Sequence, residues 1–328
     1  MLLALGSGQL ERGSLTLGGL IALILYIERL VFPTALLGFT LSSFQTGQVS
    51  LERVEDLLSR EASIQDPNHA IDLEPNNAGA AIEARNLCIR YPGADRNSLE
   101  GLSFRIKPGE LVAVVGPVGS GKTTLARALG RMLEVPPTQL WLNGQDVTHL
   151  KLADLRQQIA MVPQEGYLFS ATLRENLSYG APDAAEALLN QVVQQAQLQS
   201  DLDSFPEGYQ TIVGERGITL SGGQRQRTSL ARALLVDAPL LVLDDALASV
   251  DNRTAAAILQ SLTIDLHRTV LFISHQLSAA AACDRVLVIV EGRLVQEGTH
   301  RELLAQEGTY RKLWEREKAS SELEAAAG

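Results

Sequence analysis

The sequence predicts an α/β protein in which a parallel sheet is flanked by helices and is preceded by one long apolar helix. Buried-strand patterns such as Leu240–Leu243 and Val270–Ile273 alternate with helical patterns along the second part of the chain. This alternation is typical of parallel sheets, which bind ligands at the carboxyl ends of their strands. Residues 17–41 form the one stretch that is long enough to cross a bilayer as a helix.

Length and composition are those of a globular protein with one large domain or two ordinary ones. The 328 residues are 45% hydrophobic, which is enough for a packed core. The 38 Asp and Glu outnumber the 28 Lys and Arg, so we expect no nucleic-acid partner.

Cys88 and Cys283 have no metal-ligand spacing, which predicts neither a zinc site nor a disulfide framework. No basic segment precedes the first apolar residues, so we expect no secretory signal.

The apolar stretch at residues 17–41 contains two adjacent charges, Glu28 and Arg29. On an insertion scale its 14 Leu, Ile, Phe and Val residues contribute roughly −4 to −8 kcal/mol, and two central charges cost roughly +5 to +7 kcal/mol. Alone, this helix would insert marginally. In a bundle, neighbouring helices would shelter the charges and satisfy the backbone around Pro33. The alternative is a buried helix of a soluble protein, interrupted by a surface pair.

The following segments suggest the domain boundaries. Residues 44–60 turn polar but keep helical spacing, so we expect them to continue the same helix. Residues 61–80 are rich in turn formers and predict a linker. A second domain is expected over residues 81–318, opening with short β-like runs and the apolar strand Leu111–Val115. Residues 319–328 are expected to form a polar tail.

A glycine-rich loop lies between the strand pattern Leu111–Val115 and a helical pattern. It matches G-x-x-x-x-G-K-[ST], in which backbone N–H groups curl around phosphate oxygens at a helix N-terminus. Lys122 is expected to reach the β and γ phosphates, and the Thr123 hydroxyl to ligate magnesium. An ordinary glycine turn is the alternative, which the flanking strand and helix disfavour. The residues expected to bind ATP are Gly116, Pro117, Val118, Gly119, Ser120, Gly121, Lys122, Thr123 and Thr124.

The strand pattern Leu240–Leu243 is followed by a carboxylate, Asp244. An acidic residue at the end of a buried strand can hold Mg²⁺ beside a phosphate loop, often through water. A strand-end aspartate can also be a mere helix cap, but a phosphate loop without such a residue would have an incomplete metal site. We therefore predict that ATP binds together with Mg²⁺, held by Thr123 and Asp244.

The segment Leu220–Arg227 reads LSGGQRQR and resembles the signature of ATP-binding cassette (ABC) transporters. The chain is similar to this family from about residue 15 to residue 318. The resemblance implies the P-loop NTPase fold, with a RecA-like parallel sheet, an antiparallel β subdomain and a helical subdomain between Gln164 and Ser221. It also implies that residues 1–60 are the C-terminal part of an exporter membrane domain.

Four further residues stand in the order that the family shows. Tyr91 resembles the aromatic residue that stacks on adenine, and Asp251 resembles the D-loop aspartate. Gln164 resembles the glutamine that orients water or magnesium, and His275 resembles the switch histidine that contacts the γ-phosphate. Each residue alone has a structural explanation, such as a strand-edge aromatic or a solvated loop residue. Their ordered co-occurrence favours the roles that they have in the family.

In this family two ATP-binding domains meet head to tail, so each nucleotide lies between one phosphate loop and the other domain's signature. The resemblance implies that an isolated chain builds no complete site and that its partner is a second ABC half-transporter. The residues expected to face the partner's nucleotide are Ser221, Gly222, Gly223 and Gln224.

Two segments resemble exporters in particular. Thr211–Gly217 is similar to the X-loop of exporters, and residues 168–176 also resemble exporter sequence. An exporter half has a set of membrane helices before its ATPase domain, of which this chain offers only what resembles the last. We expect a fragment, a split gene or a truncated product that works with the missing helices. The expected location is the cell (inner or plasma) membrane, with the ATPase domain in the cytoplasm.

One position departs from the family pattern. Hydrolytic members follow the strand-end aspartate with a glutamate, the general base for the attacking water, whereas this chain has Asp245. The carboxylate is retracted by one methylene, and a displacement of about 1 Å can cost on the order of a hundredfold in rate. The expected catalytic residues are therefore a slow Asp245 together with His275 and Gln164.

The aspartate beside an intact signature resembles the degenerate-site subunit of a heterodimeric exporter, so we favour a heterodimer over a homodimer. A regulatory ATP-binding subunit with a slow site and a truncated inactive half-transporter are the alternatives. A soluble ABC ATPase acting on nucleic acid is disfavoured by the acidic balance and by residues 17–41.

Overall fold

The computed structural model describes residues 8, 10, 12–73, 79–263 and 268–327. Residues 74–78 of the expected linker and residue 328 of the expected tail lie outside the described part. The chain divides into two compact units, Met1–Ala62 and Ser63–Gly328.

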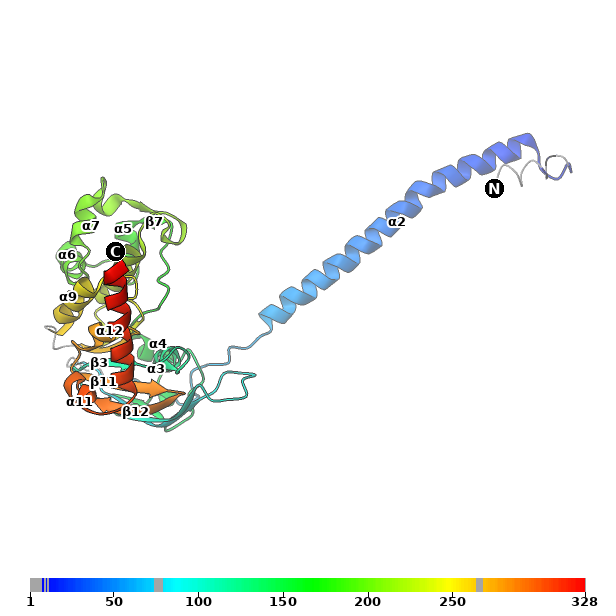
Figure 1. Cartoon of the computed structure of the whole chain (residues 1–328). Helices are drawn as coiled ribbons and strands as arrows, with labels where there is room; N and C mark the ends of the chain where they lie inside the picture. Colours follow the sequence, from blue (N-terminus) through cyan, green and yellow to red (C-terminus); the bar gives the residue numbers. More distant parts are fainter. Residues whose placement is uncertain (1–7, 9, 11, 74–78, 264–267, 328) are drawn as a thin grey trace. The chain divides into compact units, whose positions relative to one another are not determined.

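The first unit is dominated by one helix, α2 (Leu17–Leu58), which is 42 residues long (Figure 1). Thr16 caps its start, because the threonine hydroxyl accepts a hydrogen bond from the N–H of Gly19 at 3.1 Å. No residue of α2 is buried, and Pro33 lies within it. Among the described residues, α2 is the one helix that is long and apolar enough to cross a membrane.

The helix continues through residues 44–58, as its spacing predicts. At a rise of 1.5 Å per residue it is about 63 Å long, roughly twice the thickness of the hydrocarbon core of a bilayer. The apolar residues 17–41 are therefore sufficient to span a bilayer, and the polar second half of the helix would extend beyond it.

The second unit contains a six-stranded sheet in the order β12-β11-β3-β10-β9-β6. Five of these strands run parallel, and β12 pairs antiparallel with β11. Every residue of β3, β9 and β10 is buried, as expected for parallel strands covered on both faces. The strands are β3 (Leu111–Val115), β6 (Ile159–Val162), β9 (Leu240–Asp244), β10 (Thr269–Ile273), β11 (Arg285–Val290) and β12 (Arg293–Gly298).

A second sheet is four-stranded and antiparallel, in the order β2-β1-β4-β5. Together the two sheets confirm the predicted α/β fold with an antiparallel β subdomain. The strands are β1 (Ile82–Ile89), β2 (Leu99–Ile106), β4 (Leu140–Leu142) and β5 (Gln145–Asp146).

The core lies on both faces of the parallel sheet, because side chains alternate along each strand. In β9, Leu241 and Leu243 belong to a buried cluster that includes helices α6, α8 and α9. Leu240 and Val242 belong to a second cluster, shared with β1, β2 and α3. The helices are α3 (Lys122–Leu129), α4 (Leu152–Gln157), α8 (Gly222–Leu235), α9 (Asn252–Thr263), α10 (Leu277–Ala280) and α11 (His300–Ala305).

A helical subdomain lies between β6 and α8, at the end of the second unit opposite β12 (Figure 1). A short antiparallel pair, β7 with β8, joins its start to the segment before α8. Its elements are β7 (Ala171–Thr172), α5 (Leu173–Leu177), α6 (Glu186–Gln195), α7 (Gln199–Ser204) and β8 (Ile212–Val213).

The expected linker (residues 61–80) and the expected polar tail (residues 319–328) contain more regular structure than the sequence suggested. Within the expected linker, Ile71 pairs with Leu150, and Asp66 accepts a hydrogen bond from the N–H of Leu152 at 2.7 Å. At the other end, α12 (Thr309–Ala327) runs through the residues expected to form a polar tail. The alanines and glutamates of that tail are strong helix formers, so the helix does not end there.

Candidate functional site

The loop between β3 and α3 has a backbone that only glycine allows at two positions. Gly121 has φ +100°, and a Cβ atom there would lie 2.4 Å from the carbonyl oxygen of Ser98. A Cβ atom on Gly116 would lie 2.0 Å from the carbonyl oxygen of Ile289. The glycines therefore let the loop fold closely against two neighbouring segments at the start of α3.

Lys122 is the first residue of α3, directly after this loop, and is 6% exposed. Its ammonium donates hydrogen bonds to the carbonyl oxygens of Gly116 at 2.9 Å and Pro117 at 2.8 Å. Burial lowers the pKa of Lys122, and the charges of Asp245 and Asp244 act in the opposite direction. A cation held at the centre of a ring of backbone groups is suited to bind phosphate oxygens.

Two candidate magnesium ligands meet beside the loop. The hydroxyl of Thr123 donates to a carboxylate oxygen of Asp244 at 3.1 Å. Burial raises the pKa of Asp244, so a cation bound there would offset the cost of its buried charge. Hydroxyl and carboxylate oxygens fit Mg²⁺, which also takes ligands from water and from nucleotide phosphates. Among the described residues, no group of three or more His, Cys, Asp and Glu could hold a metal without such help.

Asp245 brings together the three residues expected to act in catalysis. The side-chain amide of Gln164 donates to Oδ2 of Asp245 at 3.4 Å, and Nε2 of His275 lies 3.7 Å from the same oxygen. The Asp245 backbone has φ +54°, and its N–H donates to the carbonyl of Ile273 at 2.9 Å. The ends of β9, β10 and β6 thus place a carboxylate, an imidazole and an amide around one point, where a water molecule could be activated.

These groups line one cavity of about 520 Å³. The cavity lies at the carboxyl ends of the parallel strands, where α/β sheets bind ligands. Its lining residues are Ser98, Val118, Gly119, Ser120, Gly121, Lys122, Thr123, Thr124, Gln164, Asp244, Asp245, Ile273 and His275.

Neither Tyr91 nor Asp251 is among the residues that line this cavity. The Tyr91 hydroxyl lies 3.3 Å from the hydroxyl of Thr124, so the ring is beside the first turn of α3. Asp251 accepts a hydrogen bond from the N–H of Thr254 at 2.9 Å at the start of α9, and this contact lowers its pKa.

The signature residues form the start of α8. The hydroxyl of Ser221 accepts from the N–H of Gln224 at 3.2 Å, and Oε1 of Gln224 accepts from the N–H of Ser221 at 2.9 Å. This reciprocal pair is a capping box. Gly222 and Gly223 lie against Ser249, and a Cβ atom on Gly223 would lie 3.0 Å from its carbonyl oxygen. The helix N-terminus is thus fixed in place while its first backbone N–H groups have no intrahelical acceptor.

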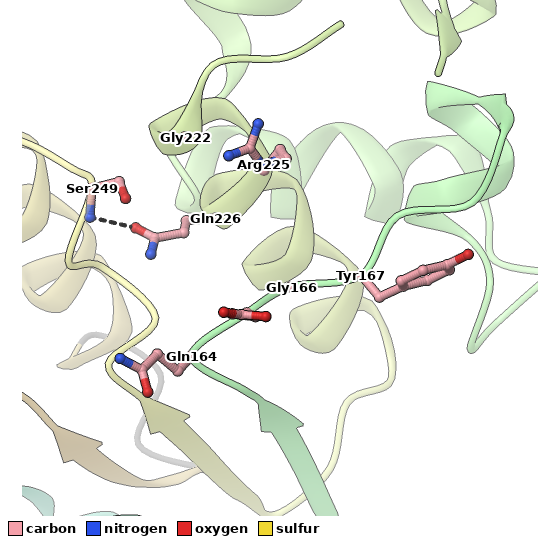
Figure 2. A pocket seen from close by; sticks show the side chains of 8 residues that line it. Gln164, Gly166, Tyr167, Gly222, Arg225, Gln226 and Ser249 are labelled. Carbon is pink, nitrogen blue, oxygen red and sulfur yellow. Dashed lines mark hydrogen bonds between the residues drawn. The ribbon is translucent and has the colours of Figure 1, made fainter. Parts of the chain in front are cut away.

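The signature and the phosphate loop belong to different cavities. Gly222 lines a second cavity of about 580 Å³, with Gln164, Gly166, Arg225 and Ser249 around it (Figure 2). Within the described part of the chain, none of Ser221–Gln224 lines the cavity at the phosphate loop. The two predicted phosphate-binding motifs therefore line different cavities, which have Gln164 in common.

Sequence reasoning missed two side chains that hold these loops. Oε1 of Gln226 accepts from the N–H of Ser249 at 2.7 Å, which ties α8 to the loop before Asp251 (Figure 2). The carboxylate of Glu317 on α12 accepts from the N–H of Leu277, 40 residues away, at 2.6 Å and so fixes the segment after His275. Gln226 belongs to the quoted LSGGQRQR motif and could have been considered. Nothing in the local sequence of Glu317 indicates its contact.

Comparison with known proteins identifies the family. Residues 99–248 match the family model described as ABC transporter. The chain is 37% identical over its whole length to a "Probable multidrug resistance ABC transporter ATP-binding/permease protein" of Bacillus subtilis, covering 56% of that protein. It is 35% identical over 95% of its length to an "ATM1-type heavy metal exporter" of Novosphingobium aromaticivorans, covering 51% of that protein.

A solved structure, of a bacterial Atm1-family ABC exporter with ATP bound, is also similar. The match covers 96% of this chain and 55% of the exporter's chain, with a TM-score of 0.79 and 34% sequence identity. The chain spans about half the length of the curated relatives that it matches. The matched domain, the shared fold and the exporter relatives show that the chain contains the ATP-binding domain of the ABC transporter family.

Proposed function

We propose that the chain binds Mg-ATP at its phosphate loop and uses it, through head-to-tail association with a second half-transporter, to power export across a membrane. The observation that supports this most is the separation of the two phosphate-binding motifs into two cavities. A signature that lines a different cavity from its own chain's phosphate loop is suited to bind the γ-phosphate of a nucleotide held by a partner. ATP would then join two chains, and its hydrolysis would release them.

The roles at the chain's own site follow from its geometry. Lys122 would bind the β and γ phosphates, Thr123 and Asp244 would hold Mg²⁺, and the oxygen of Gln164 would complete the metal's ligands. His275 would donate to the γ-phosphate. Asp245 would accept a proton from water, but its short side chain remains close to β9, which predicts slow turnover at this site.

The slow site leads us to propose a heterodimer. In such a pair, the partner supplies a glutamate as base, and this chain's Ser221–Gln224 completes the partner's faster site. A regulatory ATP-binding subunit, in which ATP at the Asp245 site holds the dimer together, is the second candidate. This second candidate also rests on the aspartate at position 245, where hydrolytic members of the family have a glutamate. The two candidates differ in whether the Asp245 site hydrolyses ATP within one transport cycle, which single-turnover measurements on each site would reveal.

The proposed location is the cell membrane, with the ATP-binding unit in the cytoplasm. Residues 17–41 of α2 would span the bilayer beside the helices of a partner. Those neighbours would shelter Glu28 and Arg29, because exposure of either charge to lipid would cost several kcal/mol. Carbonate extraction of membranes tests the location, since a peripheral protein would be released and this chain would remain in the membrane fraction.

Partner dependence of ATP hydrolysis tests the main proposal. The full chain in detergent is titrated with the half-transporter that copurifies with it, and phosphate release is followed. We expect negligible hydrolysis by the chain alone and a rate that rises until the two subunits are equimolar. A rate per chain that depends neither on concentration nor on the partner would mean that each chain contains a complete site.

A further inference from the structure

Asp201, on α7 of the helical subdomain, holds two residues of the signature helix. One carboxylate oxygen accepts from the side-chain amide of Gln224 at 3.0 Å, and the other accepts from the guanidinium of Arg227 at 2.6 Å. The side chains of Asp201 and Arg227 are only 15% and 14% exposed. Within the described residues, Nε of Arg227 is buried without a partner, so this guanidinium depends on Asp201. The carboxylate is therefore a partly buried link between two helices.

The contact with Gln224 determines which way its amide points. An ionised carboxylate only accepts hydrogen bonds, so Asp201 can face the NH₂ group of Gln224 but not its oxygen. The oxygen is then turned toward the N–H of Ser221, from which it accepts at 2.9 Å. That bond is half of the capping box at the start of α8. Asp201 thus sets the orientation on which the cap of the signature helix depends.

The capping box in turn determines which hydrogen-bond donors of Ser221 remain free to bind a ligand. Its hydroxyl oxygen accepts from the N–H of Gln224, and its own N–H is bonded to Gln224. The hydroxyl hydrogen of Ser221 and the N–H groups of Gly222 and Gly223 are left to bind an anion. We propose that Asp201 is a positioning residue for the signature, which aligns Ser221, Gly222 and Gly223 for the phosphate of a nucleotide bound by a partner. This inference rests on the proposed head-to-tail function.

Hydrogen-bond counting predicts the effect of Asp201→Asn. The asparagine has one acceptor oxygen, and the charged guanidinium of Arg227 is the stronger donor, so that oxygen turns to Arg227. The asparagine NH₂ then faces Gln224 and forces its amide to turn over. Two donors, the NH₂ of Gln224 and the N–H of Ser221, would face each other, and the capping box would be lost.

A second substitution should restore the cap. In Asp201→Asn with Gln224→Glu, the new carboxylate accepts both from the NH₂ of Asn and from the N–H of Ser221. Gln224→Glu alone should destabilise the cap more than Asp201→Asn does, because it places two carboxylates face to face. Asp203→Asn is the matched control. Asp203 lies on the same helix and carries the same charge, but it accepts from Gln199 at 2.7 Å and contacts no signature residue in any hydrogen bond of the described structure.

The experiment measures ATP turnover in the assembled pair and nucleotide binding by each variant of the full chain. We expect Asp201→Asn to lower turnover about fivefold or more and Asp203→Asn to leave it unchanged, with own-site binding within about twofold for both. Asp201→Asn should also lower the midpoint of thermal unfolding, because the cap is lost, and the double variant should recover that midpoint. Its turnover should stay low, because Gln224→Glu places a charge in the signature itself. Unchanged turnover in Asp201→Asn would overturn the inference. So would a double variant whose unfolding midpoint is no higher than that of Asp201→Asn, or an Asp201→Asn chain that loses own-site binding because it fails to fold.

Gly222→Asp, measured in the same assembly, separates this inference from the proposed function. If Gly222→Asp keeps full turnover, the signature does not act on a partner's nucleotide, and both proposals are wrong. If it abolishes turnover while Asp201→Asn has no effect, only the role of Asp201 is wrong.

Discussion

The phosphate-loop region and the signature region are suited to bind phosphate by different physical means. At the phosphate loop, Lys122, Asp244, Asp245 and His275 surround one cavity at the ends of parallel strands. The start of α8 presents neutral groups, namely a hydroxyl and backbone N–H donors, held in place by the capping box of Ser221. The first region can hold a nucleotide and its metal by itself. The second can add donors only to a nucleotide held elsewhere, which is why we assign the two regions to different ATP molecules.

The largest effect that separates the two regions is expected from Lys122→Ala. Losing a buried ammonium that is expected to bind two phosphates should weaken ATP binding to the full chain about a hundredfold, the equivalent of one or two charge-assisted hydrogen bonds. Fluorescent nucleotide titration measures this, with Lys107→Ala, an exposed lysine of the same unit, as the control. Near-normal affinity in Lys122→Ala would show that ATP does not use this loop.

The reciprocal change is Gly222→Asp, or Ser221→Arg, in the signature. A charge at the start of α8 should leave ATP binding to the isolated chain within about twofold but suppress turnover in the assembled pair about a hundredfold. Equilibrium binding and phosphate release, measured on one preparation, test both parts. If the isolated chain lost its nucleotide, the two regions would share one ATP and the contrast between them would be wrong.

Asp245→Glu addresses the catalytic side of the phosphate-loop region. A longer carboxylate should reach the attacking water and raise hydrolysis at this chain's own site about ten- to a hundredfold, provided that the partner has an intact signature. Asp245→Asn should hardly change total turnover in the natural pair. Near-complete loss of activity in Asp245→Asn would show that the aspartate is already a working base and that a homodimer with two active sites is the better description.

A smaller effect is expected on stability, from Asp244→Asn. Burial raises the pKa of Asp244, so its ionised form destabilises the folded state at neutral pH. The asparagine should raise the midpoint of thermal unfolding at pH 7 by a few degrees, the change that about 1 kcal/mol causes in a unit of this size, while removing stabilisation by Mg-ATP.

The gain should shrink as the pH falls, because the folded wild type takes up its proton before the unfolded chain does. Below about pH 3.9, the ordinary pKa of an aspartate, Asp244 is neutral in both states and the difference should vanish. A scan of unfolding midpoints against pH measures this. If Asp244→Asn instead lowered the unfolding midpoint at pH 7 and this loss shrank on acidification, the pKa of Asp244 would be lowered and its charge would stabilise the apo chain.

The sequence predicts the phosphate-loop region better than the signature region, for a physical reason. Residues such as Lys122 and Asp244 sit at fixed offsets from strands whose apolar runs are visible in the sequence, so the parallel sheet places them together. The contacts that hold the signature, such as Asp201 with Gln224, join helices whose packing no local pattern reveals. Glu317 is a similar case, because its contact with the segment after His275 depends on where α12 lies against α10.

Chain-resolved vanadate trapping of labelled ATP in the assembled pair tests the central claim most directly. The claim is that the phosphate loop serves this chain's nucleotide and the signature serves the partner's. We predict that Lys122→Ala removes the label from this chain. Gly222→Asp should instead lower the trapped label on the partner about tenfold or more and leave this chain's own binding intact. If both variants removed label from this chain alone, the two regions would act on one nucleotide, which would contradict the account.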